Sequence, residues 1–217
     1  MKMKIFFICL FISSVVINAT GIDDIQRAVN NITESKPPFD IRKAQYTKSF
    51  GISNEDNIIP DRMYDDFQLS QYVHASDFDD AGLSMDFKIK VNNHIIGVIS
   101  CGGILESESY SLVTIDANYK IIDAIEVSVS CYCPNKVYAK QFRITGDGII
   151  LINRVIPIDK NLVLFQNFSQ FTGYITETAY QIDDNGKFVK KSERKCTGTR
   201  VFTKQQLENK SLWDLIH

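Results

Sequence analysis

Histidines and cysteines are the residues of this sequence best suited to nucleophilic catalysis. The histidines are His74, His94 and His217, and Cys101 is followed by two glycines, the local sequence most like that of a nucleophile. A Cys–His or Ser–His–Asp site needs a histidine beside its nucleophile. His94 begins the predicted strand that ends near Cys101, so the two residues lie about 23 Å apart. His74 remains free to approach Cys101, but nothing in the sequence places it there, and a structural cysteine is the simpler interpretation.

The acidic segment Asp77–Gly82 has carboxylates that could bind calcium. An EF-hand loop needs a ligand where Ala81 stands and a bidentate glutamate where Lys88 stands, which excludes that form. A calcium turn of another type stays open beside the simpler interpretation, a solvated acidic turn. The sequence has no Gly-x-Ser-x-Gly, His-Glu-x-x-His or phosphate-loop pattern. We therefore predict no cofactor and no metal, and we favour a protein that is not an enzyme.

Aromatic residues are frequent in the second half of the chain and could form a surface for a carbohydrate or peptide ligand. In strands, however, aromatic side chains are mostly core residues and cross-strand partners, which is the simpler interpretation. The residues concerned are Tyr132, Tyr138, Phe142, Phe165, Phe168, Phe171, Tyr174 and Tyr180.

A turn pattern returns along the chain and organises it. The segments Ile115–Ile122 and Ile182–Val189 each place an Asp/Asn cluster between two apolar runs, and Ile158–Val163 is a shortened copy. Asp and Asn bond their own backbone and tolerate left-handed φ angles, so each copy predicts a β-hairpin turn. The cluster at Asp183–Gly186 therefore needs no metal to explain it.

Between these turns the sequence predicts a mostly β fold, an antiparallel up-and-down meander of about 8–9 strands. Some strands are apolar on both faces, so a bent sheet, a sandwich and a barrel all stay open. An N-terminal helix at Ile22–Ile32 and a C-terminal helix at Thr203–His217 flank the strands, and Thr203 and Gln206 have the spacing of a capping box. The predicted strands are 85–91, 94–100, 109–115, 120–133, 137–144, 148–156, 162–171, 174–182 and 187–202.

The N-terminus predicts export. Lys2 and Lys4 precede an apolar run that is too short for a comfortable membrane span, which is the pattern of a signal peptide. We therefore divide the chain into residues 1–20 as signal peptide, 21–60 as N-terminal helix and linker, and 61–217 as the β domain. No second apolar stretch could span a bilayer, and the net charge of −2 argues against a nucleic-acid partner.

Export would leave Cys101, Cys131, Cys133 and Cys196 in an oxidising compartment. Following the predicted strands up and down places Cys101, Cys131 and Cys133 at one end of the sheet. Cys196 falls about 30 Å below that end. If one disulfide forms, we predict that it joins Cys101 to Cys131 or Cys133.

The segments Tyr110–Ile125 and Thr178–Val189 resemble uncharacterised secreted bacterial β-meander proteins, through the rhythm of tyrosine, strand, Asp-x-Asn-Gly-Lys and strand. The resemblance covers about Ser109 to Val189 and implies no catalytic residues. The function expected from the sequence is that of a secreted or periplasmic, non-catalytic β domain with a binding or envelope-structural role. Its partner would be a carbohydrate, a peptide or an envelope component. The alternatives are a calycin-like carrier of a small apolar ligand in a closed barrel, and a hydrolase using Cys101.

Overall fold

The computed structural model describes residues 25–45, 58–59, 83–102, 107–132, 136–162 and 168–216. The predicted signal peptide, His74, the acidic segment Asp77–Gly82 and His217 all lie outside these ranges. Within them, the helices are too short and too polar to cross a lipid bilayer.

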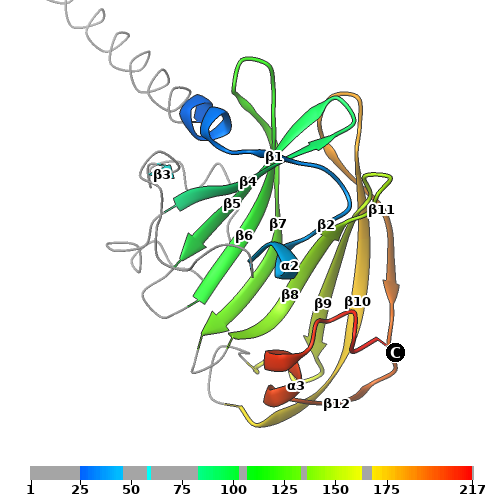
Figure 1. Cartoon of the computed structure of the whole chain (residues 1–217). Coiled ribbons are helices and arrows are strands. Elements are labelled where there is room, and N and C mark those ends of the chain that lie inside the picture. The colour runs from blue at the N-terminus through cyan, green and yellow to red at the C-terminus, as the bar shows by residue number, and fades with distance from the viewer. Residues whose placement is uncertain are drawn as a thin grey trace, which may run out of the picture.

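Twelve strands form one sheet, and its main path runs in the order β1-β4-β5-β6-β7-β8-β9-β10-β11. All described pairs are antiparallel except β1 with β4. The meander predicted from the sequence is confirmed, and its form is a sheet that does not close into a barrel (Figure 1). The strands are β1 Glu34–Ser35, β2 Phe39–Asp40, β3 Ile58–Ile59, β4 Leu83–Val91, β5 His94–Gly102, β6 Ser107–Ile115, β7 Ile121–Tyr132, β8 Lys136–Ile144, β9 Ile150–Pro157, β10 Gln170–Ile182, β11 Phe188–Lys195 and β12 Arg200–Thr203.

The turn predicted between residues 171 and 174 does not form, and the last long strand therefore runs in the direction opposite to the predicted one. The sequence suggested a strand break near Thr172 and Gly173, but β10 runs unbroken through both residues. Gly173 serves close packing instead, since a Cβ there would lie 2.6 Å from the Ile156 carbonyl oxygen of β9. β11 therefore runs opposite to the prediction, and Cys196 follows the end of β11 that lies level with Cys101. The two cysteines are still separated by the width of the sheet, from β5 to β11.

The two full copies of the repeated turn have the same hydrogen bonds. Asp116 Oδ1 accepts from the backbone N–H groups of Asn118 and Lys120, both at 2.8 Å. Asp183 Oδ1 accepts in the same way from Asn185 at 3.0 Å and Lys187 at 2.8 Å. The fourth position of each turn is left-handed, with φ of 61° at Tyr119 and 82° at Gly186. The hairpins predicted at these turns are therefore confirmed.

Replacing Gly186 by valine is expected to lower the free energy of unfolding by about 2 kcal/mol. Valine tolerates a φ of +82° poorly, and its Cβ would lie 2.7 Å from Ile122 Cδ1. Urea denaturation measures the loss. Gly146→Val is the matched control, because a Cβ at Gly146 meets nothing within 4 Å. Equal stability of the two variants would show that the turn adapts to a side chain.

Consecutive residues of β5 define two faces of the sheet. Val98 points to what we call the inner face, and Ile99 points to the outer face, since side chains alternate along a strand. Val98 packs in the largest core cluster, together with Leu112, Phe142 and Ile150. On the outer face, the helical residues 25–31 bring Ile25, Ala28 and Val29 against Met85 and Ile99.

The C-terminal segment covers the outer face at the other side of the sheet. α3, Lys204–Asn209, begins with the capping box predicted from the sequence, because Thr203 and Gln206 each bond the other's backbone N–H. The leucines of this segment are buried against Val155, Ile175 and Phe202. They are Leu207, Leu212 and Leu215.

The inner face is crossed by a segment that we call the strap, residues 34–45. It contains β1, β2 and the short helix α2, Ile41–Gln45. β1 pairs with β4, and β2 pairs with the C-terminal end of β8, so the strap spans the sheet (Figure 1). Residues 39–45, which fall in the segment expected to be N-terminal helix and linker, therefore contain β2 and α2. Two-residue strands and a single helical turn are too short to produce a periodic pattern.

At the hairpin end, the β10–β11 turn bonds to the middle of the sheet. The Thr114 hydroxyl donates to the Gly186 carbonyl at 2.6 Å, and the Phe188 N–H donates to Asp123 Oδ2 at 2.9 Å. The Lys187 ammonium donates to the Ile122 carbonyl at 2.6 Å. Among the described residues, hydrogen bonds that involve side chains, and not a strand ladder, therefore connect the β10–β11 turn to β6 and β7.

β11 is an edge strand within the described part of the chain, where β10 is its only strand partner. Seven of its eight residues are exposed. Four of the eight, Lys190, Lys191, Arg194 and Lys195, are basic, and only Glu193 is acidic.

Candidate functional site

An open pocket of about 730 Å³ lies between the strap and the sheet. The strap contributes Lys36, Phe39 and Lys43, while Phe87 of β4 and Arg143 of β8 come from the sheet. Its lining residues are Ser35, Lys36, Pro38, Phe39, Asp40, Lys43, Ala44, Phe87, Arg143, Ile144 and Thr145. Its volume is in the range of small-molecule sites.

Phe39 fixes the strap to the sheet and forms part of the pocket. Its ring meets that of Phe87 edge-on at 5.2 Å and stacks on that of Phe142 at 6.0 Å, measured between ring centroids. The residue after it, Asp40, accepts a hydrogen bond from the Arg42 N–H at 3.0 Å, which ties the carboxylate to the first turn of α2. The strap can insert here because β7 and β8 stop pairing at Lys140, before the residues with which β2 pairs.

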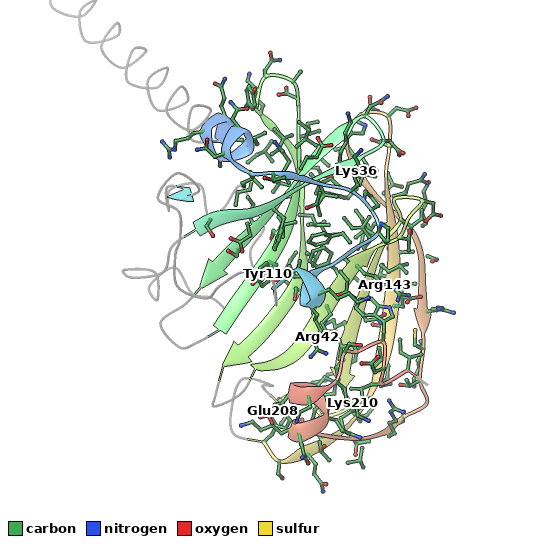
Figure 2. The ribbon with its side chains drawn as sticks, in the orientation of Figure 1. Lys36, Arg42, Tyr110, Arg143, Glu208 and Lys210 are labelled. Atoms are coloured by element: carbon green, nitrogen blue, oxygen red, sulfur yellow. The ribbon has the colours of Figure 1, made fainter. Side chains whose placement is uncertain are left out.

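The charges of the pocket are mainly positive. Lys36, Lys43 and Arg143 oppose the single carboxylate of Asp40, so the formal balance is three minus one, or +2. The exposed ammonium groups of Lys36 and Lys43 form no ion pair with the described residues. The Arg143 guanidinium lies 4.7 Å above the Trp213 ring, and its Nε is buried without a hydrogen-bond partner in the described structure. Figure 2 labels Lys36 on the strap and Arg143 on β8.

This arrangement suits binding better than covalent catalysis. All lining residues belong to the described ranges, and none is a histidine or cysteine. Among the described residues, Ser35 and Thr145 therefore have no imidazole beside them to act as a general base. Aromatic and aliphatic side chains with a few cations instead match a ligand that has an apolar body and an anionic group.

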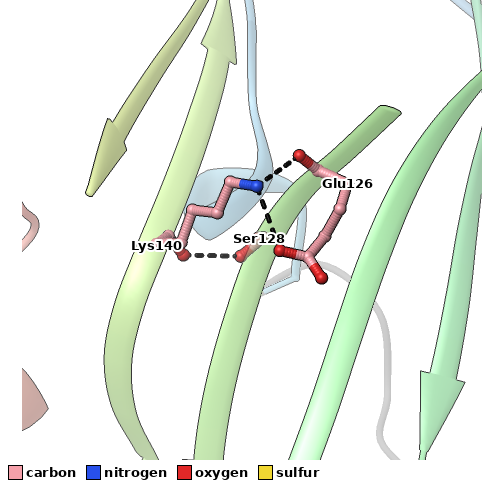
Figure 3. A network of polar contacts seen from close by, with 3 residues as sticks. All are labelled: Glu126, Ser128 and Lys140. Carbon is pink, nitrogen blue, oxygen red and sulfur yellow. Dashed lines mark hydrogen bonds and ion pairs between the residues drawn. The ribbon is translucent and has the colours of Figure 1, made fainter. Parts of the chain in front are cut away.

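A network of polar contacts among Glu126, Ser128 and Lys140 lies where β7 and β8 separate (Figure 3). The Lys140 ammonium donates to the Glu126 carbonyl at 2.5 Å and pairs with Glu126 Oε1 at 3.0 Å. The Ser128 hydroxyl donates to the Lys140 carbonyl at 2.9 Å. Burial lowers the pKa of Lys140, and the Glu126 carboxylate opposes this shift. These bonds replace the ladder bonds lost where the strands diverge, so we assign the network a structural role.

Lys140→Met is expected to lower the free energy of unfolding by about 2 kcal/mol at neutral pH. It removes both bonds to Glu126 and leaves that carboxylate, with a side-chain exposure of 21%, without its partner. Glu126→Gln in the same chain should recover part of the loss, because the two residues are coupled. Guanidinium denaturation of the wild type, both single variants and the double variant measures the coupling. Strict additivity would contradict it.

The lowered pKa of Lys140 gives this network a pH dependence with a defined sign. The unfolded chain binds the proton more readily than the folded chain between the lowered pKa and the ordinary value of 10.5. The free energy of unfolding of the wild type should therefore gain a contribution as pH rises through that interval. Lys140→Met should lack this contribution, and parallel denaturation curves from pH 7 to 10.5 compare the two proteins.

His74, the histidine that the sequence left open as a partner of Cys101, lies outside the described residues. His94 and Cys101 stand at opposite ends of the β5 ladder, opposite Val91 and Leu83 of β4. The described ranges contain no group of three or more His, Cys, Asp or Glu residues placed to hold a metal ion. The aromatic residues Phe142 and Phe171 are buried in the core.

The predicted disulfide stays a prediction. Cys101 lies opposite Ser109 of β6, and Cys131 lies opposite Ser107, so β6 separates the two backbones. Cys133 lies outside the described residues. Cys196 is a free, half-buried thiol, and burial raises its pKa, with the nearby Glu177 carboxylate as the second cause.

Sequence reasoning missed the pocket itself. Its strap residues come from residues 21–60, the segment expected to be N-terminal helix and linker. Only Phe39, an aromatic residue directly after two prolines, signals that this segment packs on something. Comparison with known proteins finds no matching family model, no matching curated protein and no matching solved structure.

Proposed function

We propose that the protein is an exported, non-catalytic β domain that acts by binding, and that the pocket beneath the strap is its binding site. The observation that carries this proposal is the pocket of about 730 Å³, whose wall combines aromatic rings with cations. The export proposal rests on the charged and apolar pattern of the first residues.

The arrangement of the sheet favours this pocket over the interior of a barrel. A carrier of the calycin type would need a closed barrel, whereas this sheet is open. The inner face between the strands is filled by core residues such as Leu112, Phe142 and Ile152. A hydrolase using Cys101 is less well supported, because His94 stands at the far end of the same strand.

The binding proposal is tested with a fluorescent apolar anion, 8-anilinonaphthalene-1-sulfonate. The purified protein should bind it with saturable fluorescence enhancement, and Ser35→Trp should reduce the binding at least tenfold by filling the pocket. Thr199→Trp places the same side chain on an exposed loop outside the pocket and should leave binding unchanged. Equal binding by both variants would overturn the assignment of the site.

Export is expected to remove about the first 20 residues and to leave no lipid on the chain. Mass spectrometry of the intact protein from the exported fraction measures the new N-terminus. Retention of residues 1–20, or an acylated Cys9 as the first residue, would contradict the predicted signal peptide. Lys2→Glu with Lys4→Glu, which removes the positive charge before the apolar run, should reduce export.

A further inference from the structure

We infer that the pocket beneath the strap takes a free, single-chain anionic amphiphile, of which a long-chain carboxylate is the simplest example. This inference rests on the proposed binding function and names the class of ligand for the same site. It follows from how the apolar and charged parts of the pocket are arranged.

The apolar part of the pocket suits a hydrocarbon chain. Phe39 and Phe87 contribute aromatic rings, and Pro38, Ala44 and Ile144 contribute aliphatic surface. Hydrocarbon placed against these side chains leaves water, which is favourable in proportion to the apolar surface buried. Phe39 is held by its contacts with Phe87 and Phe142, so part of this surface is formed before a ligand arrives.

The charged part of the pocket selects the sign of the ligand. Lys36 and Lys43 are exposed cations, and Arg143 is a third. Asp40 Oδ1 already accepts a hydrogen bond from the backbone of α2, which engages part of its charge. A carboxylate in the pocket therefore meets two exposed ammonium groups, with Arg143 as a further cation of the lining, whereas an ammonium group would meet net repulsion.

Two other anionic partners fit the structure less well. An acidic peptide adding as a strand at the pocket needs a free strand edge there, but β2 already occupies the end of β8 by pairing with it at Asp40 and Arg143. A membrane surface would engage protruding apolar side chains as well as cations. Among the described residues, the exposed large apolar side chains are Ile158, Val189 and Val201, and none of them belongs to the strap. A free amphiphile that enters the pocket is therefore the favoured occupant.

The experiment is calorimetric titration with sodium dodecanoate below its micelle-forming concentration. Dodecyltrimethylammonium, with a similar chain and the opposite charge, and butyrate, with the same charge and a short chain, are the comparison ligands. Dodecanoate should bind at one saturable site, and both comparison ligands should bind at least tenfold more weakly. Lys36→Ala with Lys43→Ala should weaken dodecanoate binding at least tenfold, and added salt should weaken binding to the wild type.

The matched control is Lys191→Ala with Lys210→Ala, which removes two exposed lysines that lie outside the pocket. This control should bind dodecanoate like the wild type. Thermal unfolding of both double variants checks that each is folded; all four lysines are exposed, so the midpoints should change little.

The outcomes separate this inference from the proposed function. If dodecanoate and dodecyltrimethylammonium bind equally and Ser35→Trp abolishes both, the inference fails and the binding site stands. If Ser35→Trp changes the binding of none of the probes, both proposals fail. If anionic vesicles bind through Lys36 and Lys43 while monomeric dodecanoate does not, the ligand is a membrane surface and the inference is overturned.

Discussion

Ending the chain after Thr203 is expected to abolish cooperative folding. The deletion removes Leu207, Leu212 and Leu215, whose exposed fractions are 0%, 0% and 4%. Truncating one buried leucine to alanine costs about 2–5 kcal/mol. Three such losses are comparable to the whole free energy of unfolding of an ordinary domain, about 5–15 kcal/mol. The deletion also uncovers Phe202 and removes the Leu212 N–H that donates to the buried Gln141 side chain at 2.9 Å.

Circular dichroism during urea denaturation measures this effect, and the truncated chain should show no sharp transition. Asn209→Ala with Lys210→Ala is the control within the same segment, since both residues are exposed. That control should change the free energy of unfolding by no more than about 0.5 kcal/mol. A truncated chain with a transition near that of the wild type would show that the C-terminal segment is not part of the core.

Replacing Phe39 by alanine should both destabilise the protein and remove ligand binding at the strap. Burial of phenylalanine in a core is worth about 3–5 kcal/mol in such substitutions. Phe39 is 7% exposed and contacts the rings of Phe87 and Phe142. Because β2 pairs with β8 through only two residues, Phe39 and Asp40, the strap depends on this side chain for its position.

Two measurements on one sample test this expectation. Urea denaturation gives the loss of stability. Titration with the fluorescent sulfonate in the absence of urea, where the variant is folded, gives the loss of binding. Phe39→Leu keeps an apolar side chain and should lose less of both. Glu34→Ala, at an exposed strap residue, is the control for stability. An unchanged free energy of unfolding in Phe39→Ala would show that other contacts anchor the strap.

Local chemistry explains which parts of the fold could be predicted from the sequence. Asp116 and Asp183 act through bonds to backbone groups two and four residues away, so the hairpins are encoded within each turn. The capping box at Thr203 and Gln206 is equally local. Gly173 shows the limit of such reasoning, because its role depends on the approach of Ile156 from a neighbouring strand.

The candidate site could not be predicted in the same way. Lys36, Phe39 and Arg143 meet only because the strap crosses from β4 to β8, and neither β1 nor β2 is long enough to show strand periodicity. β7 and β8 stop pairing at Lys140, which leaves room for β2. His94 and Cys101, which the sequence already placed at opposite ends of one strand, are held apart by that strand.

The basic residues of β11 bear on how copies of this protein behave in a crowded compartment. An unpaired strand edge is a template on which a second molecule can extend the sheet, and such growth leads to aggregation. Two β11 edges that approached each other would bring Lys191 and Lys195 of each copy together, while Lys190 and Arg194 are paired with Glu193 and Glu177. Their mutual repulsion opposes edge-to-edge assembly, so this strand keeps the open sheet from becoming the start of a fibril.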